Sequence, residues 1–237
     1  MSDSFRLRIA FAKQGRLRWL SHLELSRALE RLIRRSGLPY AVSQGFNRHM
    51  RFASSPALPV GTSGLHELFD VWLTKYVSPE EALGMLQAAA GDAIPVLGVE
   101  YVSSKLKGLQ ATHTAHRYIV TFRYNQNEGQ AEQQADSEQG TAVSAKELEG
   151  LQASLDALRE RSPLTLTSKG KAKNYDLNGI IIEPFTIEGT LASDGSIQLT
   201  CSLRNSNEGS LRPEQYLLAA LGSQVEVVSV TRLSLEA

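Results

Sequence analysis

The alternation of apolar and polar positions near the start of the chain predicts a strand followed by a helix. Over residues 5–12 every second side chain is apolar, the pattern of a strand with one buried face, and two arginines occupy the other face. Gly15 ends the alternation, and a short second strand is expected over residues 17–19. Ser21 and Glu24 then have the spacing of a capping box, which predicts a helix start.

The predicted helix ends at Gly37 and Pro39, residues that stop helices. Its apolar positions recur at helical spacing, and they are Leu25, Ala28, Leu29, Leu32 and Ile33. The arginines of this segment lie away from that stripe. We therefore expect an amphipathic helix whose outer face is strongly cationic.

Together with the strand and helix above, the rest of the chain gives the order strand, helix, strand, strand, helix, strand twice. The expected elements are strands at 49–54 and 65–77, a helix from Ser78, strands at 96–103 and 117–124, a helix from Ser144, an additional segment at 164–175, strands at 180–188 and 196–203, a helix from Pro213 to Gly222 and a strand at 225–235. This order predicts an α+β protein of two tandem ferredoxin-like (βαββαβ) domains with antiparallel sheets, over residues 1–110 and 111–237. Residues 125–141 are polar and acidic, which predicts a mobile loop.

Composition excludes several classes of protein. With 42% hydrophobic residues and no apolar run of about 20 residues, a membrane span is not expected. The first residues lack the apolar core of a secretory signal, so we expect a soluble cytoplasmic protein. The single cysteine, Cys201, excludes an internal disulfide and a thiolate metal site, and the five histidines show no metal-ligand spacing. No metal and no cofactor are therefore predicted.

Charge is distributed unevenly although the net charge is zero. Residues 1–51 hold eleven cationic and three acidic side chains, a net charge of +8, so the other 186 residues carry −8. Ten of the eleven cations are arginine, whose flat guanidinium suits bidentate contact with phosphate or carboxylate. The first fifty residues thus predict an anion-binding surface.

Two segments hold the candidate binding residues. The helix start offers free amides and the positive end of the helix dipole beside the preceding arginines, and the loop after the helix combines a glycine, amides, an aromatic ring and potential cations. The candidates for contact with RNA or another phosphorylated substrate are Arg16, Arg18, Ser21, His22, Arg27, Arg31, Gln44, Asn47, Arg48 and His49. Each also has an ordinary interpretation, because helices need caps, loops need Gly and Asn, and exposed helix faces are commonly charged.

Several of these segments resemble the radical-SAM-associated (radical-SAM-linked) proteins of bacteria. The similar blocks are residues 8–24 (RIAFAKQGRLRWLSHLE), 28–31 (ALER), 36–47 (SGLPYAVSQGFN), 58–61 (LPVG), 175–177 (YDL), 209–213 (GSLRP) and 231–233 (TRL). The chain departs from that pattern at Arg48-His49-Met50, where Pro-His-Pro is usual, and at Asn178-Gly179, where Arg-Pro is usual. The resemblance implies a partner, a radical-SAM protein encoded beside or fused to the domain, and it supplies no known activity. One cysteine cannot hold the three-cysteine cluster of the radical enzyme itself.

Three functions remain open on these grounds. The first is a non-catalytic accessory protein of a radical-SAM enzyme system that binds RNA or another anionic substrate through the N-terminal arginines. The second is a metal-independent RNA-processing endonuclease with His22 and His49 as acid and base. The third is a protein–protein interaction module whose arginines meet an acidic partner.

Overall fold

A computed structural model describes residues 5–125, 143–168, 170–191, 195–205 and 210–236. The predicted mobile loop at 125–141 lies outside these residues except for Asn125. The chain is an α+β protein in which the strands described within each unit pair in antiparallel fashion, as the alternating patterns predict. It divides into a first unit, residues 1–114 with 232–237, and a second unit, residues 115–231.

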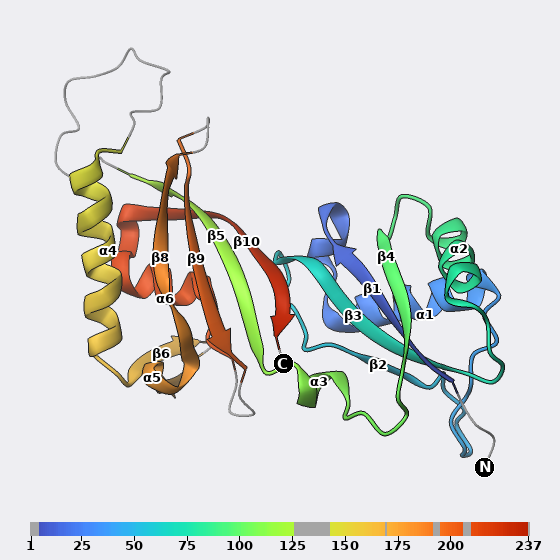
Figure 1. Cartoon of the computed structure of the whole chain (residues 1–237). Coiled ribbons are helices and arrows are strands. Elements are labelled where there is room, and N and C mark those ends of the chain that lie inside the picture. Colours follow the sequence, from blue (N-terminus) through green and yellow to red (C-terminus); the bar gives the residue numbers. More distant parts are fainter. Residues whose placement is uncertain (1–4, 126–142, 169, 192–194, 206–209, 237) are drawn as a thin grey trace. The chain divides into compact units, whose positions relative to one another are not determined.

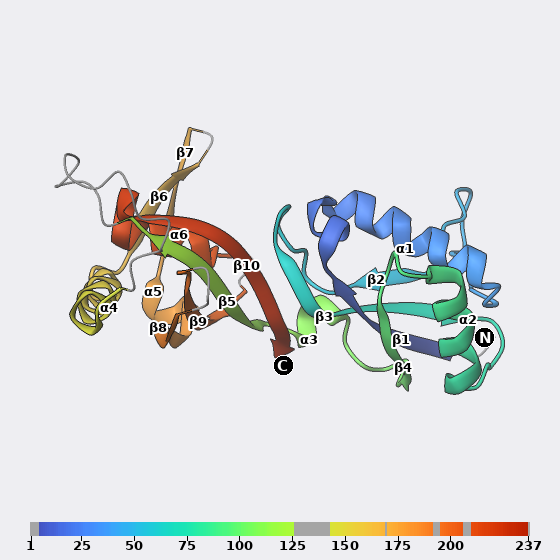
Figure 2. The ribbon, with the colours of Figure 1, turned by 90° about the horizontal axis from the view of Figure 1, so that it is seen from above.

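The first unit places two helices on one face of an antiparallel sheet (Figures 1 and 2). Its elements are β1 (Phe5–Lys13), η1 (Gly15–Trp19), α1 (His22–Ser36), β2 (Phe52–Ser54), β3 (Ser63–Leu73), α2 (Pro79–Ala90), β4 (Val96–Val102) and α3 (Leu109–Thr112). The strands occur in the order β4-β1-β3, and β2 pairs with β3. Apolar side chains of α1 and α2 pack on alternate residues of β1 and β3, and together they form the core of this unit.

The second unit has the same order of main elements. Its elements are β5 (Ala115–Tyr124), α4 (Ala145–Glu160), β6 (Leu164–Ser168), β7 (Lys171–Tyr175), α5 (Leu177–Ile180), β8 (Ile181–Leu191), β9 (Ile197–Arg204), α6 (Pro213–Leu221), η2 (Gly222–Gln224) and β10 (Val225–Glu236). The strands follow the order β10-β5-β9-β8. The last residues of β10, from Arg232 on, belong to the first unit.

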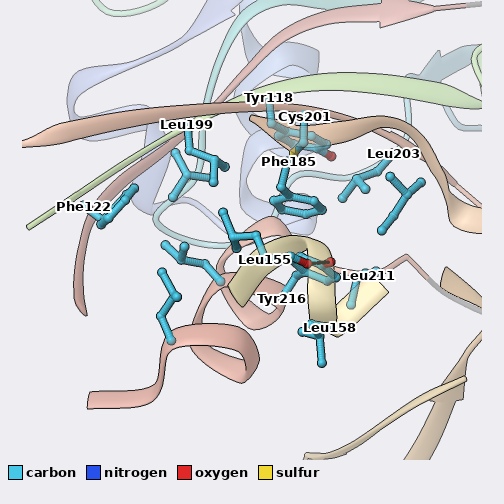
Figure 3. Close-up of a cluster of buried hydrophobic side chains, with 14 of the residues drawn as sticks. Tyr118, Phe122, Leu155, Leu158, Phe185, Leu199, Cys201, Leu203, Leu211 and Tyr216 are labelled. Carbon is cyan, nitrogen blue, oxygen red and sulfur yellow. Dashed lines mark hydrogen bonds between the residues drawn. The ribbon is translucent and has the colours of Figure 1, made fainter. Parts of the chain in front are cut away.

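The core of the second unit is apolar and aromatic. Figure 3 shows Phe185 and Tyr216 facing each other, and their rings stack with centroids 4.0 Å apart. The Tyr216 hydroxyl donates a hydrogen bond of 2.6 Å to the carbonyl of Leu155, which ties α6 to α4. Cys201 lies in the same core with 1% of its surface exposed.

Both predicted capping boxes are confirmed. The side chains of Ser21 and Ser144 accept from the backbone amides of Glu24 and Glu147, and each glutamate accepts from the backbone amide of its serine. α1 ends at Gly37, whose φ of 76° is the left-handed conformation that glycine adopts readily.

One local expectation is wrong, and another becomes more specific. The predicted strand at residues 17–19 is wrong, because this segment is the 3-10 helix η1, closed by hydrogen bonds from the amide of Leu17 to the carbonyl of Gln14 and from Leu20 to Leu17. The positive φ of Gly15, 54°, turns the chain out of the strand path immediately before η1. The additional segment at 164–175 forms the antiparallel hairpin of β6 and β7, a sheet of its own.

Candidate functional site

The outward face of α1 carries a row of exposed arginines. Its inward positions Leu29, Leu32 and Ile33 are fully buried against the sheet, so the polar positions between them face away from the core. The exposed arginines of this face are Arg27, Arg31, Arg34 and Arg35. Their spacing of three and four residues places them along one side of the helix, which is about 22 Å long.

Little of this charge is neutralised locally. Arg34 pairs with Glu30 at 3.8 Å and lies over the ring of Tyr40, with 5.6 Å to the ring centroid. Glu24 is a neighbour of Arg27, but its carboxylate is held by Ser21. In the described part of the chain no ion pair is seen to Arg31 or Arg35. This surface is therefore open to an external anion. We call it the arginine face of α1.

The start of α1 is less suited to an anion than the sequence indicates. The Glu24 carboxylate accepts hydrogen bonds from the Ser21 hydroxyl at 2.7 Å and from the Ser21 amide at 2.9 Å. These bonds lower the pKa of Glu24. A fixed negative charge thus stands at the first turn, where the helix dipole would otherwise attract a phosphate.

Beside the helix start, η1 presents an exposed tryptophan. Trp19 has 59% of its surface exposed, and the Arg18 guanidinium lies 4.7 Å from the centroid of its ring. Gly61, with φ of 89°, approaches the ring so closely that a Cβ there would lie 3.4 Å from it. The Gly61 amide donates to the carbonyl of Arg18 at 2.8 Å. The segment that carries Gly61 thus lies against one part of the ring, and the rest of the ring is exposed to solvent.

A buried lysine fixes η1 to the segment that carries Gly61. Lys13 is 1% exposed, and its ammonium donates to the carbonyls of Arg18, Pro59 and Thr62 at 3.2, 3.4 and 3.5 Å. Burial lowers the pKa of Lys13, and the nearby carboxylate of Glu67 opposes that shift. Lys13 and Pro59, which are hydrogen-bonded here, belong to two of the blocks that carry the family resemblance. Glu67, beside Lys13, is paired with Arg232, which belongs to a third block.

The loop after α1 projects an aromatic side chain. The Ser43 amide donates to the carbonyl of His49 at 2.7 Å, and the His49 amide donates to the Ser43 hydroxyl at 3.1 Å. These bonds close a short excursion of the chain whose residues 44–49 are all exposed. Phe46 stands at its tip, fully exposed at 114%.

Eight of the ten predicted site residues flank α1. Arg16 and Arg18 lie in η1, Ser21 and His22 at the helix start, and Gln44, Asn47, Arg48 and His49 follow the helix end. The other two, Arg27 and Arg31, belong to the arginine face itself. His22 lines a cavity of about 20 Å³, room for about one water molecule, together with residues 54–58 and Glu67. His49 is not among the residues that line this cavity, and the whole of α1 lies between His22 and His49 in the chain.

Three of the eleven predicted surface cations are buried, a correction to the charge count above. Arg6 and Arg8 are 3% and 8% exposed, and both guanidiniums donate to the single carboxylate of Asp70. Arg6 also donates to the carbonyls of Leu106 and Lys107, at 2.6 and 3.2 Å. Lys13 is the third. The strand arginines thus stabilise the interior instead of extending the anion-binding surface.

Sequence reasoning missed the acidic partners of these cations. Asp70 and Glu67 both lie in β3, and their cations are distant in the sequence, by 64 residues for Arg6 and by 165 for Arg232. Trp19 was not selected either. Its signal is a tryptophan next to an arginine in a short loop between a strand and a capped helix, which favours exposure over burial.

Other chemistry-bearing groups carry no comparable site. A hollow of about 270 Å³ on the sheet face away from the helices is lined by Arg8, His66 and Glu100. It thus combines a cationic guanidinium with an anionic carboxylate. Burial raises the pKa of the Cys201 thiol, which leaves it unreactive. Among the described residues no cluster of His, Cys, Asp or Glu could hold a metal ion, and no described helix has the length and hydropathy to cross a bilayer.

Comparison with known proteins identifies the chain by family alone. Residues 6–213 match the model of a family described as an uncharacterized protein conserved in bacteria (DUF2344). A search of curated proteins finds no match.

The similar solved structures resemble this chain only distantly. They include an H/ACA RNP bound to a substrate RNA containing 2′-deoxyuridine (8% identity, TM-score 0.44) and a Cbf5-Nop10-Gar1 complex (8% identity, TM-score 0.42). Each match covers 97% of this chain, which spans about half of the matched chains, 47% and 48%. A protein of unknown function from Galdieria sulphuraria matches over 98% of this chain and 100% of its own at 11% identity, with a TM-score of 0.27. Similarity at these values identifies no shared function.

Proposed function

This chain belongs to the DUF2344 family of uncharacterized bacterial proteins, and we propose that it binds RNA through the arginine face of α1, with no catalytic step of its own. The observation that carries the proposal is the row of four exposed arginines on one side of that helix, of which one has an ion pair at 3.8 Å. A polyanion gains most from such a row, because several phosphates are neutralised at once and counterions are released.

The arginine face is better suited to a phosphate backbone than to a single small anion. Its side chains extend over about 22 Å of helix and are exposed, so no enclosed pocket gathers them on one group. Guanidinium groups in a row offer bidentate donors to successive phosphates. Arg16 in η1, before the helix, and Arg48 in the loop after it are further exposed cations.

The order of the strands supports a more specific fold for each unit, the ferredoxin-like fold, which is part of this proposal. The order β4-β1-β3-β2 in the first unit and β10-β5-β9-β8 in the second is the same arrangement of first, second, third and fourth strands. With two helices in each core, this order supports two ferredoxin-like domains, and we propose the two units as those domains. Fold alone assigns no activity.

The rival functions have less support. An endonuclease with His22 and His49 as acid and base needs both imidazoles at one phosphodiester, and α1 stands between them. An accessory role beside a radical-SAM protein, in the cytoplasm, stays a prediction from the family resemblance. A protein partner for the arginine face is an outcome of the experiment below.

The test is binding of a fluorescein-labelled RNA, measured by anisotropy between 50 and 200 mM salt. We expect affinity to fall steeply with salt, and the triple variant R27E/R31E/R34E to bind roughly tenfold or more weakly and to reduce the slope of log K against log salt by about 2. The matched control K146E/R161E/R212E makes the same charge change at exposed cations of the second unit and should keep most of the affinity.

Circular dichroism of both variants checks that each keeps the helix content of the unaltered protein. Affinity that does not depend on salt, or that both triple variants reduce equally, contradicts the proposal. Recovery of an acidic protein that survives nuclease treatment, with no RNA bound, would favour the interaction module instead.

A further inference from the structure

We infer that the RNA bound by this surface is single-stranded, with unpaired bases stacking on Trp19 and Phe46. The inference rests on the proposed function and goes beyond it, because the arginine face alone does not distinguish a duplex from a single strand. Both rings are exposed, 59% for Trp19 and 114% for Phe46. Trp19 ends η1, before the start of α1, and Phe46 lies in the loop after the end of α1. Base stacking on aromatic side chains is a main contribution to single-strand binding.

Trp19 is held in place without being buried. Gly61 lies so near the ring that a Cβ there would come within 3.4 Å of it. Lys13 holds the carbonyl of Arg18 together with those of Pro59 and Thr62. A ring that is fixed before the ligand arrives loses little side-chain entropy on binding. The Arg18 guanidinium lies over the same ring, 4.7 Å from its centroid. An incoming base therefore takes the place of this cation on the ring face or stacks on the flat guanidinium itself.

Phe46 is exposed on a loop whose base is closed by hydrogen bonds. The bonds between Ser43 and His49, with a third from the Arg51 amide to the carbonyl of Ala41, hold the two strands of the loop together. The tip residues have no core contact that accounts for a phenylalanine at this position. Arg48 follows Phe46 by two residues, so ring and cation again occur together.

The length of α1, the helix that separates the two ring-bearing segments in the chain, suits a short strand. At the 3.4 Å per nucleotide of a stacked strand, this length corresponds to roughly six nucleotides. The inferred path of the strand follows the arginine face, whose guanidiniums would meet the phosphates. A duplex keeps its bases inside the helix, where neither ring reaches them, so it gains from the arginines alone.

The experiment compares a twelve-nucleotide oligouridine with a twelve-base-pair RNA duplex at one salt concentration. We expect W19A and F46A each to weaken oligouridine binding roughly tenfold, and to change duplex binding less than about twofold. W19F and F46Y keep a ring and should retain most of the affinity. L23A is the matched control, because Leu23 is 58% exposed on the first turn of α1 and carries no ring.

A second readout follows the ring directly. The chain has two tryptophans, so W72F leaves Trp19 as the only one. Oligouridine should quench its fluorescence, and the duplex should not. The inference is overturned if the ring variants weaken duplex and single strand equally, or if L23A weakens the single strand as much as W19A does. Duplex binding that responds to R27E/R31E/R34E but not to W19A would leave the proposed function standing and remove this inference alone.

Discussion

The interior of the first unit contains charged side chains beside its apolar core, whereas the interior of the second unit is apolar and aromatic. The two units nevertheless share an order of elements. The charged side chains that are buried in the described part of the chain all belong to the first unit, in two clusters. One joins Arg6 and Arg8 to Asp70, and the other joins Lys13 and Arg232 to Glu67. Each cluster has two cations and one carboxylate, so each carries a net charge of +1.

The second unit instead packs apolar and aromatic side chains between α4, α6 and its sheet. Its ion pair between Arg117 and Glu183 is on the surface, with both side chains about half exposed. The comparison teaches that one arrangement of elements can be stabilised by two kinds of interior. The first depends on each charge keeping its partner, and the second depends on the shape of its side chains.

The largest expected effect comes from D70N. This change leaves two buried guanidiniums without a counter-charge, and it should destabilise the first unit by about 3–5 kcal/mol. Hydrogen exchange measured by mass spectrometry separates peptides of β3 from those of β9, and only those of the first unit should lose protection. The control E183Q removes an exposed carboxylate and should cost less than about 1 kcal/mol. Equal losses from both changes would refute the comparison.

An intermediate effect is expected from Y216F in the second unit. The variant keeps the ring stacked on Phe185 and removes the hydroxyl that donates to the carbonyl of Leu155. A loss of about 1–2 kcal/mol is expected, because one buried hydrogen bond disappears while the packing stays. Burial raises the pKa of Tyr216 to about 12, so the hydroxyl is neutral and donating at physiological pH. Denaturant unfolding followed by Phe and Tyr signals measures the loss, and L155A, which deletes core volume, should exceed it.

The smallest effect concerns pH and has opposite signs in the two units. Burial, aided by Arg8, lowers the pKa of His113 from 6.5, so the unfolded chain takes up a proton first and stability falls as pH drops below about 6.5. Burial raises the pKa of Glu214 from 4.5, so its contribution is present at low pH and is lost as pH rises above about 4.5. Melting temperatures at pH 5 and pH 7 measure both effects. H113Q should remove the stability that is lost on going from pH 7 to pH 5, and E214Q should remove the stability that is gained over the same change. The same sign for both variants would contradict these assignments.

Sequence patterns predicted the elements whose determinants are local. The capping serines lie three residues from their glutamates, and the apolar stripe of α1 repeats every three to four residues, so a short window contains the whole signal. The prediction of a strand at residues 17–19 was wrong because the determinants of this segment are not all local. Leu17 and Trp19 alternate as in a strand, but the conformation is set by Gly15 and by Lys13 bonding to a distant segment.

The candidate site was predictable in outline only. The outward positions of α1 follow from its apolar stripe, and its arginines are exposed as that stripe predicts. The strand arginines obey the same rule of alternation, yet they are buried, because Asp70 and the carbonyls of residues 106 and 107 cover them from far along the chain. Local periodicity assigns a side chain to a face, but it does not tell whether something else covers that face.

The pairing of Glu67 with Arg232 has a consequence for synthesis of the chain. At about 5–20 residues per second, the ribosome needs roughly ten to thirty seconds to make the 165 residues between them. During that time the entire second unit emerges, while Glu67 has Lys13 as its cationic neighbour. The first unit is thus completed only when the end of β10 is synthesised, after the other elements of the second unit have been made.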